Sequence, residues 1–108
     1  MKIGMVGLGR MGGNLVRRLM RGGHACVVYD RDAHAVETLV AAGATGASSL
    51  EDLVAKLDRP RAVWLMLPAG EPTEQAVEAL GARMDAGDAV LDGGNTYFKD
   101  DEIGRAHV

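Results

Sequence analysis

The stretch Gly7-Leu8-Gly9-Arg10-Met11-Gly12 decides the fold of this chain of 108 residues, because it spaces three glycines as G-x-G-x-x-G. It follows Ile3 to Val6, a short run with β-branched residues that predicts a buried strand. Arg10 to Arg21 then places apolar side chains at helical spacing, before Gly22-Gly23 ends the predicted helix. These apolar side chains are Met11, Leu15, Leu19 and Met20.

A glycine loop between a strand and a helix is the context in which this spacing indicates a dinucleotide-binding site. Gly7 would permit the tight turn, Gly9 would let a pyrophosphate approach the backbone, and Gly12 would let helix and strand pack closely. The free N–H groups that begin the helix would then face the phosphates. The alternative is a plain strand-to-helix turn without a ligand.

Three other residues of the loop are candidate cofactor-binding residues, namely Leu8, Arg10 and Met11. Two readings of Arg10 stay open, a contact with phosphate or a solvated charge. For Met11 we expect a side chain that fills the core.

The next segments continue the alternation of strand and helix. His24 to Tyr29 predicts a second strand, and Asp32 is a candidate cap for a helix that ends at Gly43. This helix carries its apolar residues on one side: Ala35, Val36, Leu39 and Val40. Thr45 to Ala47 is a candidate short strand. Ser48 and Glu51 have capping-box spacing, which predicts a short helix running to about Leu57.

The remaining sequence repeats this pattern and settles the fold class. Ala62 to Leu67 is nearly continuous in apolar residues, as in a strand covered on both faces. The elements expected after it are a helix at Thr73 to Met84, a strand at Ala89 to Asp92, a turn at Gly93-Gly94-Asn95 and the start of a helix at Asp101 to Val108. Strands alternating with helices imply a parallel sheet with right-handed crossovers. We therefore expect one α/β domain over residues 1–108, a doubly wound parallel sheet in three layers (the Rossmann dinucleotide-binding fold).

Asp30 is the candidate partner of the adenine ribose, because an acidic residue is expected there about 20 residues past the glycine loop. Its carboxylate would repel a 2′-phosphate by about 4 kcal/mol at ~4 Å and an effective dielectric near 20. We therefore favour NAD over NADP as cofactor. Arg31 leaves an alternative open, since it could pair with a 2′-phosphate or stack on adenine. Asp30 could also be a simple helix cap.

Composition excludes several other classes of function. The net charge is −3 and no basic cluster suggests nucleic acid. No apolar stretch is long enough to span a membrane, and the start of the chain has no signal-peptide pattern. Cys26 is the one cysteine, expected as a buried small hydrophobe, which suits a reducing cytoplasm. The histidines lack metal-ligand spacing, so we expect no metal site.

Two later segments carry a resemblance to a known family. They are Trp64-Leu65-Met66-Leu67-Pro68-Ala69-Gly70 and Leu91-Asp92-Gly93-Gly94-Asn95-Thr96-Tyr97-Phe98-Lys99-Asp100. Together with Gly4 to Gly12 they resemble the 6-phosphogluconate dehydrogenases. Related 3-hydroxy-acid dehydrogenases typically have a Ser-Thr pair where this chain has Gly-Gly-Asn. NADP-using members of the family tend to carry Asn-Arg-Thr where this chain has Asp30-Arg31-Asp32, which supports NAD.

The resemblance implies further site residues. Leu67, Pro68, Ala69 and Gly70 would line the ribose on the nicotinamide side, and Asn95 would contact both cofactor and substrate. The alternatives are an ordinary loop at Pro68-Ala69-Gly70 and a plain tight turn at Gly93-Gly94-Asn95.

For an intact enzyme the resemblance implies oxidative decarboxylation of 6-phosphogluconate, a sugar-acid phosphate, to ribulose 5-phosphate by a homo-oligomer. The family continues into a substrate loop and a helical domain with a lysine base and a glutamate acid. None of that is present here, so we expect no catalytic residue and no turnover in this fragment. Two alternatives remain, a 3-hydroxyisobutyrate-like dehydrogenase and a non-catalytic dinucleotide-binding module.

Overall fold

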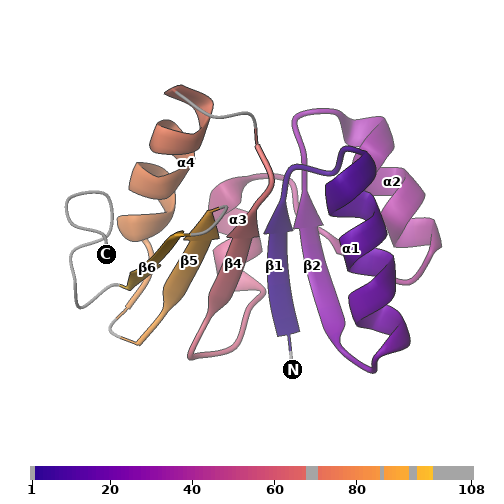
Figure 1. Ribbon diagram of the computed structural model, residues 1–108, viewed down its shortest axis with the longest axis horizontal. Helices are drawn as coiled ribbons and strands as arrows, with labels where there is room; N and C mark the ends of the chain where they lie inside the picture. Colours follow the sequence, from indigo (N-terminus) through magenta and orange to yellow (C-terminus); the bar gives the residue numbers. More distant parts are fainter. Residues whose placement is uncertain (1, 68–70, 86, 93–94, 99–108) are drawn as a thin grey trace.

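The computed structural model describes residues 2–67, 71–85, 87–92 and 95–98, with backbone only at 71–74 and 95–98 (Figure 1). The strands are β1 (Lys2–Val6), β2 (Ala25–Tyr29), β3 (Thr45–Gly46), β4 (Ala62–Leu65), β5 (Ala89–Asp92) and β6 (Asn95–Phe98). The helices are α1 (Arg10–Arg21), α2 (Ala33–Ala41), α3 (Leu50–Ala55) and α4 (Glu71–Gly81). Within this part of the chain, no helix has the length and apolar character needed to cross a membrane.

The strands form one sheet in the order β3-β2-β1-β4-β5-β6, and the first five are parallel. The central strand β1 pairs with β2 on one side and β4 on the other, so that Met5 lies between Val28 and Trp64. The order of strands reverses between β1 and β4. In open α/β sheets such a reversal creates a crevice at the carboxyl ends of the strands, where ligands bind. The predicted doubly wound parallel sheet is confirmed.

Neighbouring residues of the strands pack into separate cores on the two faces of the sheet. Met5 and Val28 join Val16 of α1 and Leu39 of α2 in one core. Val6 and Val27 face the opposite way, into a second core with residues of α3 and α4 that include Leu53, Val77 and Leu80. This alternation is the period of two expected of a strand, and it produces the three predicted layers. Cys26 lies in the first core, as expected, and burial raises the pKa of its thiol.

Two apolar side chains were assigned to the wrong side of their helices. Met11, which was predicted to fill the core, is 72% exposed, and Val40, which was predicted on the apolar side of its helix, is 45% exposed. Along α1 the buried side is centred near Val16. Met11 precedes it by five residues, a rotation of about 140° at about 100° per residue, so its side chain points away from the sheet. On α2, Leu39 is the residue that is fully buried.

The capping box of α3 lies one residue later than predicted. Ser49 is the cap and accepts a hydrogen bond from the N–H of Asp52 at 3.0 Å. The Asp52 carboxylate in turn accepts the N–H of Ser48 at 2.9 Å. A hydrogen bond from Lys56, and then that of Ser48, hold the pKa of Asp52 below its usual range. The box therefore pairs Ser49 with Asp52 instead of Ser48 with Glu51.

Three later elements also differ from the prediction. The helix α4 spans Glu71–Gly81 instead of Thr73 to Met84. β4 ends at Leu65 instead of Leu67, although the N–H of Met66 still donates to the carbonyl of Val6 at 2.8 Å. β6 was not predicted, and it lies antiparallel to β5 with Asn95 opposite Asp92. The expected turn at Gly93-Gly94 and the expected helix start after Asp101 lie outside the described residues.

A buried ion pair holds β4 and β5 together at their amino ends. Asp88 is fully buried, and its carboxylate accepts the guanidinium of Arg61 at 3.0 Å and the N–H of Asp85 at 2.8 Å. It also accepts the backbone N–H of Arg61. Burial favours the neutral acid, but these donors outweigh burial and hold the pKa of Asp88 below its usual value. This pair lies at the end of the sheet opposite the predicted site.

Removal of the Asp88 carboxylate should destabilise the fold strongly. In Asp88→Ala the buried Arg61 guanidinium keeps only the half-exposed carboxylate of Asp85, and removal of a fully buried partner typically costs about 3–5 kcal/mol. We expect a loss of this size in the free energy of unfolding, measured by urea denaturation at neutral pH.

The matched control is Asp85→Asn, because Asp85 is half-exposed and exposed ion pairs contribute about 1 kcal/mol or less.

The lowered pKa of Asp88 also predicts how stability depends on pH. The contribution of the ionised Asp88 to the free energy of unfolding is complete above the unfolded-state pKa of about 3.9, and it is lost as pH falls through the folded-state pKa. The wild type should therefore lose stability in this acid range more steeply than Asp88→Ala. Equal stabilities of Asp88→Ala and Asp85→Asn would contradict the assignment.

Candidate functional site

The glycine loop connects β1 to α1 at the point where the sheet order reverses (Figure 1). Gly7 has φ of +96°, a conformation that side chains with a Cβ rarely adopt. A Cβ at Gly7 would also lie 2.6 Å from the carbonyl oxygen of Met66, just past β4. The N–H of Gly7 donates to the carbonyl of Tyr29 at 3.0 Å, so the loop begins fixed to the end of β2.

The other two glycines of the motif have contrasting surroundings. A Cβ on Gly12 would collide with the carbonyl oxygen of Gly7, so α1 packs against β1 only because Gly12 has none. A Cβ on Gly9, by contrast, would have no protein atom within 4 Å among the described residues. Packing therefore demands glycine at positions 7 and 12, whereas at position 9 the absence of a side chain leaves open space above the backbone.

The amino end of α1 presents unpaired backbone donors beside this open space. The first helical hydrogen bond runs from the N–H of Gly13 to the carbonyl of Gly9 at 2.8 Å. The N–H groups of Arg10, Met11 and Gly12 come before it, and in the described part of the chain they have no acceptor. Gly9 is the N-cap and offers no side chain, and the first turn carries no acidic residue. Such an end favours an anion through both its donors and its dipole.

Asp30 lies against the glycine loop. One oxygen of its carboxylate accepts the N–H of Leu8 at 2.6 Å, and the other accepts the N–H of Asp32 at 2.8 Å. The cap of α2 is Asp32, which accepts the N–H of His34 at 3.0 Å. Asp30 is therefore not the helix cap, and its carboxylate stands at the junction of the loop and the end of β2.

The structure locates the other predicted site residues as follows. Arg10, Met11 and Arg31 are exposed beside the loop, and Leu8 is buried in the core next to α1.

The predicted residues after β4 and β5 are only partly within the described structure. Leu67 is partly buried, and its Cδ2 would lie 3.2 Å from a Cβ on Gly7. Asn95 opens β6 opposite Asp92 through its backbone, while its side chain lies outside the described part of the structure. Pro68, Ala69 and Gly70 also lie outside the described residues.

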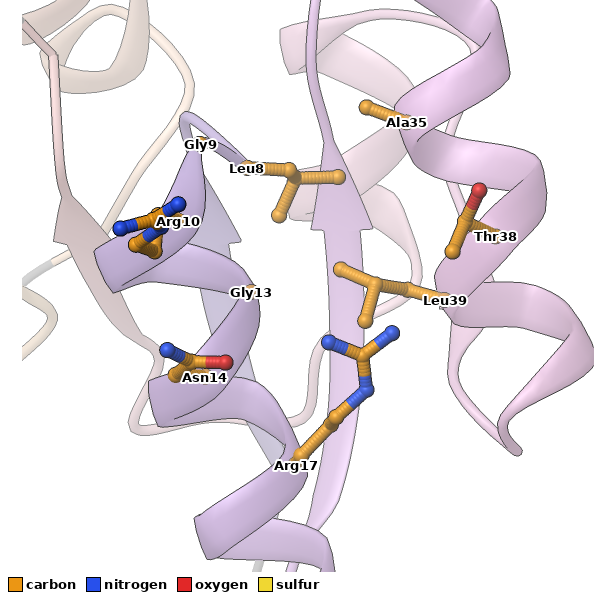
Figure 2. Close-up of a pocket in the computed structure, with 9 residues that line it drawn as sticks. All are labelled: Leu8, Gly9, Arg10, Gly13, Asn14, Arg17, Ala35, Thr38 and Leu39. Atoms are coloured by element: carbon orange, nitrogen blue, oxygen red, sulfur yellow. The ribbon is translucent and has the colours of Figure 1, made fainter.

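A cavity of about 370 Å³ lies between α1 and α2, below the glycine loop (Figure 2). Of the predicted site residues, Leu8, Gly9 and Arg10 line it, and Asp30 and Leu67 do not. Asn14, Arg17 and Thr38 also line it and were not predicted as site residues. Arg10, Asn14 and Arg17 have i, i+4, i+7 spacing, which could have marked one side of α1, but nothing in the sequence pairs Thr38 with them.

A family model described as the NAD binding domain of 6-phosphogluconate dehydrogenase matches residues 2–107. The chain belongs to this family. The matched residues include the glycine loop, Asp30 and the segment Asp92-Gly93-Gly94-Asn95.

Curated relatives carry the same family name. The NAD(+)-dependent, decarboxylating 6-phosphogluconate dehydrogenase of Haloferax volcanii is 41% identical over 100 residues, which are 93% of this chain and 33% of that protein. The decarboxylating 6-phosphogluconate dehydrogenase of Synechococcus elongatus is 42% identical over 106 residues, with 94% of this chain and 22% of that protein covered. The chain thus spans between a fifth and a third of the length of these relatives.

Solved structures share the fold. 6-Phosphogluconate dehydrogenase of Plasmodium falciparum, determined in complexes that include its cofactor NADP+, superposes with a TM-score of 0.78 at 28% identity, over 94% of this chain and 23% of that one. 3-Hydroxyisobutyrate dehydrogenase of Mycobacterium tuberculosis superposes with a TM-score of 0.76 at 27% identity, over 84% of this chain and 30% of that one. The family and the fold therefore indicate an NAD(P)-binding domain of an oxidoreductase.

The contact of Gly12 with Gly7 predicts a large effect of a single methyl group. In Gly12→Ala the Cβ meets a backbone oxygen that cannot rotate away, so we expect a destabilisation of about 1–3 kcal/mol from overpacking. Gly13→Ala is the matched control, because its Cβ would lie at ordinary distances of 3.7 Å from the Leu8 carbonyl and 3.9 Å from Arg17. An alanine there should stabilise the helix by up to about 1 kcal/mol. Urea unfolding that ranks Gly12→Ala equal to Gly13→Ala would refute the contact.

Proposed function

We propose that residues 1–108 form the dinucleotide-binding domain of a longer dehydrogenase that oxidatively decarboxylates 6-phosphogluconate to ribulose 5-phosphate. The observation that carries the proposal is the amino end of α1, with free N–H groups of Arg10, Met11 and Gly12 beside the open position of Gly9. The shares of the relatives that the chain covers support a domain of a larger enzyme. The proposal includes a cytoplasmic, homo-oligomeric full-length protein.

The residues have separate functions in the proposed site. Gly7 and Gly12 shape the loop, and the backbone at Gly9 receives the pyrophosphate. Asp30 accepts the hydroxyls of the adenine ribose, and Arg31 stacks on the adenine. The segment of Leu67, Pro68, Ala69 and Gly70 lines the other ribose, and Asn95 bridges cofactor and sugar acid through its amide.

When bound, the nicotinamide supplies the hydride chemistry. This chain contributes binding and orientation, and it excludes alternative placements of the dinucleotide. Holding two reactants in the right geometry removes up to about 7–11 kcal/mol from a barrier in the best cases. The catalytic acid and base would come from residues outside this chain.

The open space at Gly9 predicts a variant that folds but binds poorly. In Gly9→Ala the Cβ meets no protein atom, and φ of −64° suits alanine, so the free energy of unfolding should change by no more than about 1 kcal/mol. The same Cβ occupies the space where a phosphate would approach the backbone. We expect NADH affinity to fall by about tenfold or more, which corresponds to about 1.4 kcal/mol.

Isothermal titration of NADH into wild type, Gly9→Ala and Gly13→Ala measures this effect. Gly13→Ala should bind as the wild type does, because Gly13 follows the free N–H groups of α1 and its own N–H donates to the carbonyl of Gly9, so its Cβ adds a methyl group to the cavity between α1 and α2 and not to the proposed phosphate site. Binding that is unchanged in Gly9→Ala, or absent from the wild type at millimolar NADH, would overturn the proposed phosphate site.

We further propose that NAD is preferred over NADP. The support is the carboxylate of Asp30, which stands at the glycine loop and would repel a 2′-phosphate. The relatives leave the choice open, because one is named NAD(+)-dependent and another was determined with NADP+. NADH should bind the wild-type chain about tenfold more tightly than NADPH, each measured by titration at the same ionic strength. Tighter NADPH binding would show that Arg31 outweighs Asp30.

A 3-hydroxyisobutyrate-type dehydrogenase is the second candidate, favoured by the TM-score of 0.76 with the Mycobacterium tuberculosis enzyme. The higher identity to 6-phosphogluconate dehydrogenases and the Gly93-Gly94-Asn95 segment favour the first candidate. A non-catalytic dinucleotide-binding module is the third.

Turnover assays separate the three. The purified 108-residue chain should bind NADH and yet produce none from NAD and 6-phosphogluconate. The full-length gene product should form NADH with 6-phosphogluconate and not with 3-hydroxyisobutyrate. The reverse preference would select the second candidate, and binding without turnover of either substrate would select the third.

A further inference from the structure

We propose that Asp30 is a positioning residue as well as a ribose ligand. Its carboxylate clamps the glycine loop to the end of β2 before any cofactor arrives, through the N–H of Leu8 at 2.6 Å and the N–H of Asp32 at 2.8 Å. The inference rests on the proposed function for its consequence, which is dinucleotide binding. The clamp itself can be observed in the cofactor-free protein.

The loop needs such a clamp because of its composition. Glycine loses more conformational freedom on ordering than any other residue, and Gly7 and Gly9 flank Leu8. Consecutive N–H groups of this segment are anchored at the same place, Gly7 to the carbonyl of Tyr29 and Leu8 to the carboxylate of Asp30. The Leu8 side chain is also buried, at 7% exposure. Gly9 therefore follows a residue that is fixed through both backbone and side chain.

The clamp and the ribose contact can exist together. An ionised carboxylate offers about four lone-pair sites, two on each oxygen. One site on each oxygen is used, by Leu8 on one and by Asp32 on the other. One site on each remains for the two hydroxyls of an adenine ribose. Hydrogen bonds to a charged acceptor are roughly twice as strong as neutral ones, so the charge of Asp30 strengthens the clamp itself.

The two roles make different predictions for a ligand that has no ribose. If Asp30 acted only on the ribose, its removal would leave binding of inorganic pyrophosphate unchanged or improve it, because a negative charge near the anion disappears. If Asp30 orders the loop, removal should weaken pyrophosphate binding in spite of that electrostatic gain. A weaker affinity thus reports the loss of loop order.

The experiment compares wild type, Asp30→Ala and Asp32→Ala. Asp32→Ala is the matched control, because it removes the cap of α2 and an equal charge but leaves the Asp30 carboxylate and both N–H donors in place. Amide hydrogen exchange of the cofactor-free proteins, followed by NMR, should show Leu8 exchanging about tenfold or more faster in Asp30→Ala and unchanged in Asp32→Ala. Pyrophosphate affinity should fall about threefold or more in Asp30→Ala and should not fall in Asp32→Ala.

Asp30→Asn keeps the test decisive if Asp30→Ala does not fold. Its side chain has one oxygen acceptor, and its NH₂ group would face an N–H donor. One of the two amides, Leu8 or Asp32, should therefore exchange faster while the other stays protected. Protection of both amides as in wild type would overturn the proposal, as would an unchanged Leu8 amide and unchanged pyrophosphate affinity in a folded Asp30→Ala. A third result separates the two proposals. If the Leu8 amide loses protection in Asp30→Ala but neither the wild type nor any variant binds a dinucleotide, the clamp is supported and the proposed function is wrong.

Discussion

The close contact between Gly12 and the carbonyl of Gly7 is the constraint on which the rest of the structure depends. Without a Cβ at position 12, α1 begins directly on the last turn of the loop and lies against β1. Its first N–H groups are thereby held at the carboxyl end of the sheet, where the strand order reverses between β1 and β4. If a methyl group at position 12 pushed α1 away from β1, the helix would still cover the sheet. Its free N–H groups, however, would no longer lie beside the open space at Gly9.

The fold could be predicted from the sequence because its signals are local. Apolar runs such as Ala62 to Leu65, glycines after helices, and Asp32 as a cap each depend on a few neighbouring residues. The errors arise where tertiary contacts decide. The rotation of α1 follows from the Gly12 contact, and it turns Met11 to solvent. The sequence predicted Ser48 as the cap, but Ser49 accepts the N–H of Asp52, and the Asp52 carboxylate accepts the N–H of Ser48 in return.

The candidate site was predictable to a similar extent. The motif identified Gly7, Gly9 and Gly12 and predicted a different reason for glycine at each, but it could not show which atoms a side chain there would meet. Only the three-dimensional surroundings show that packing requires the first and last and leaves Gly9 open. Asp30 was expected from its distance in sequence, whereas its bond to Leu8 joins residues 22 positions apart and needs the pairing of β1 with β2. The cavity lined by Asn14, Arg17 and Thr38 likewise exists only once α1 and α2 are adjacent.

The central claim is that the amino end of α1 receives the phosphates of a dinucleotide, and NMR mapping tests it most directly. Titration of NAD+ into the ¹⁵N-labelled chain should shift the amide signals of Gly9, Arg10, Met11 and Gly12 most strongly, because their N–H groups would donate to phosphate oxygens. Shifts centred on Asn14, Arg17 and Thr38 would place the ligand in the cavity between α1 and α2 instead. That result, or an unperturbed loop at saturating NAD+, would contradict the account.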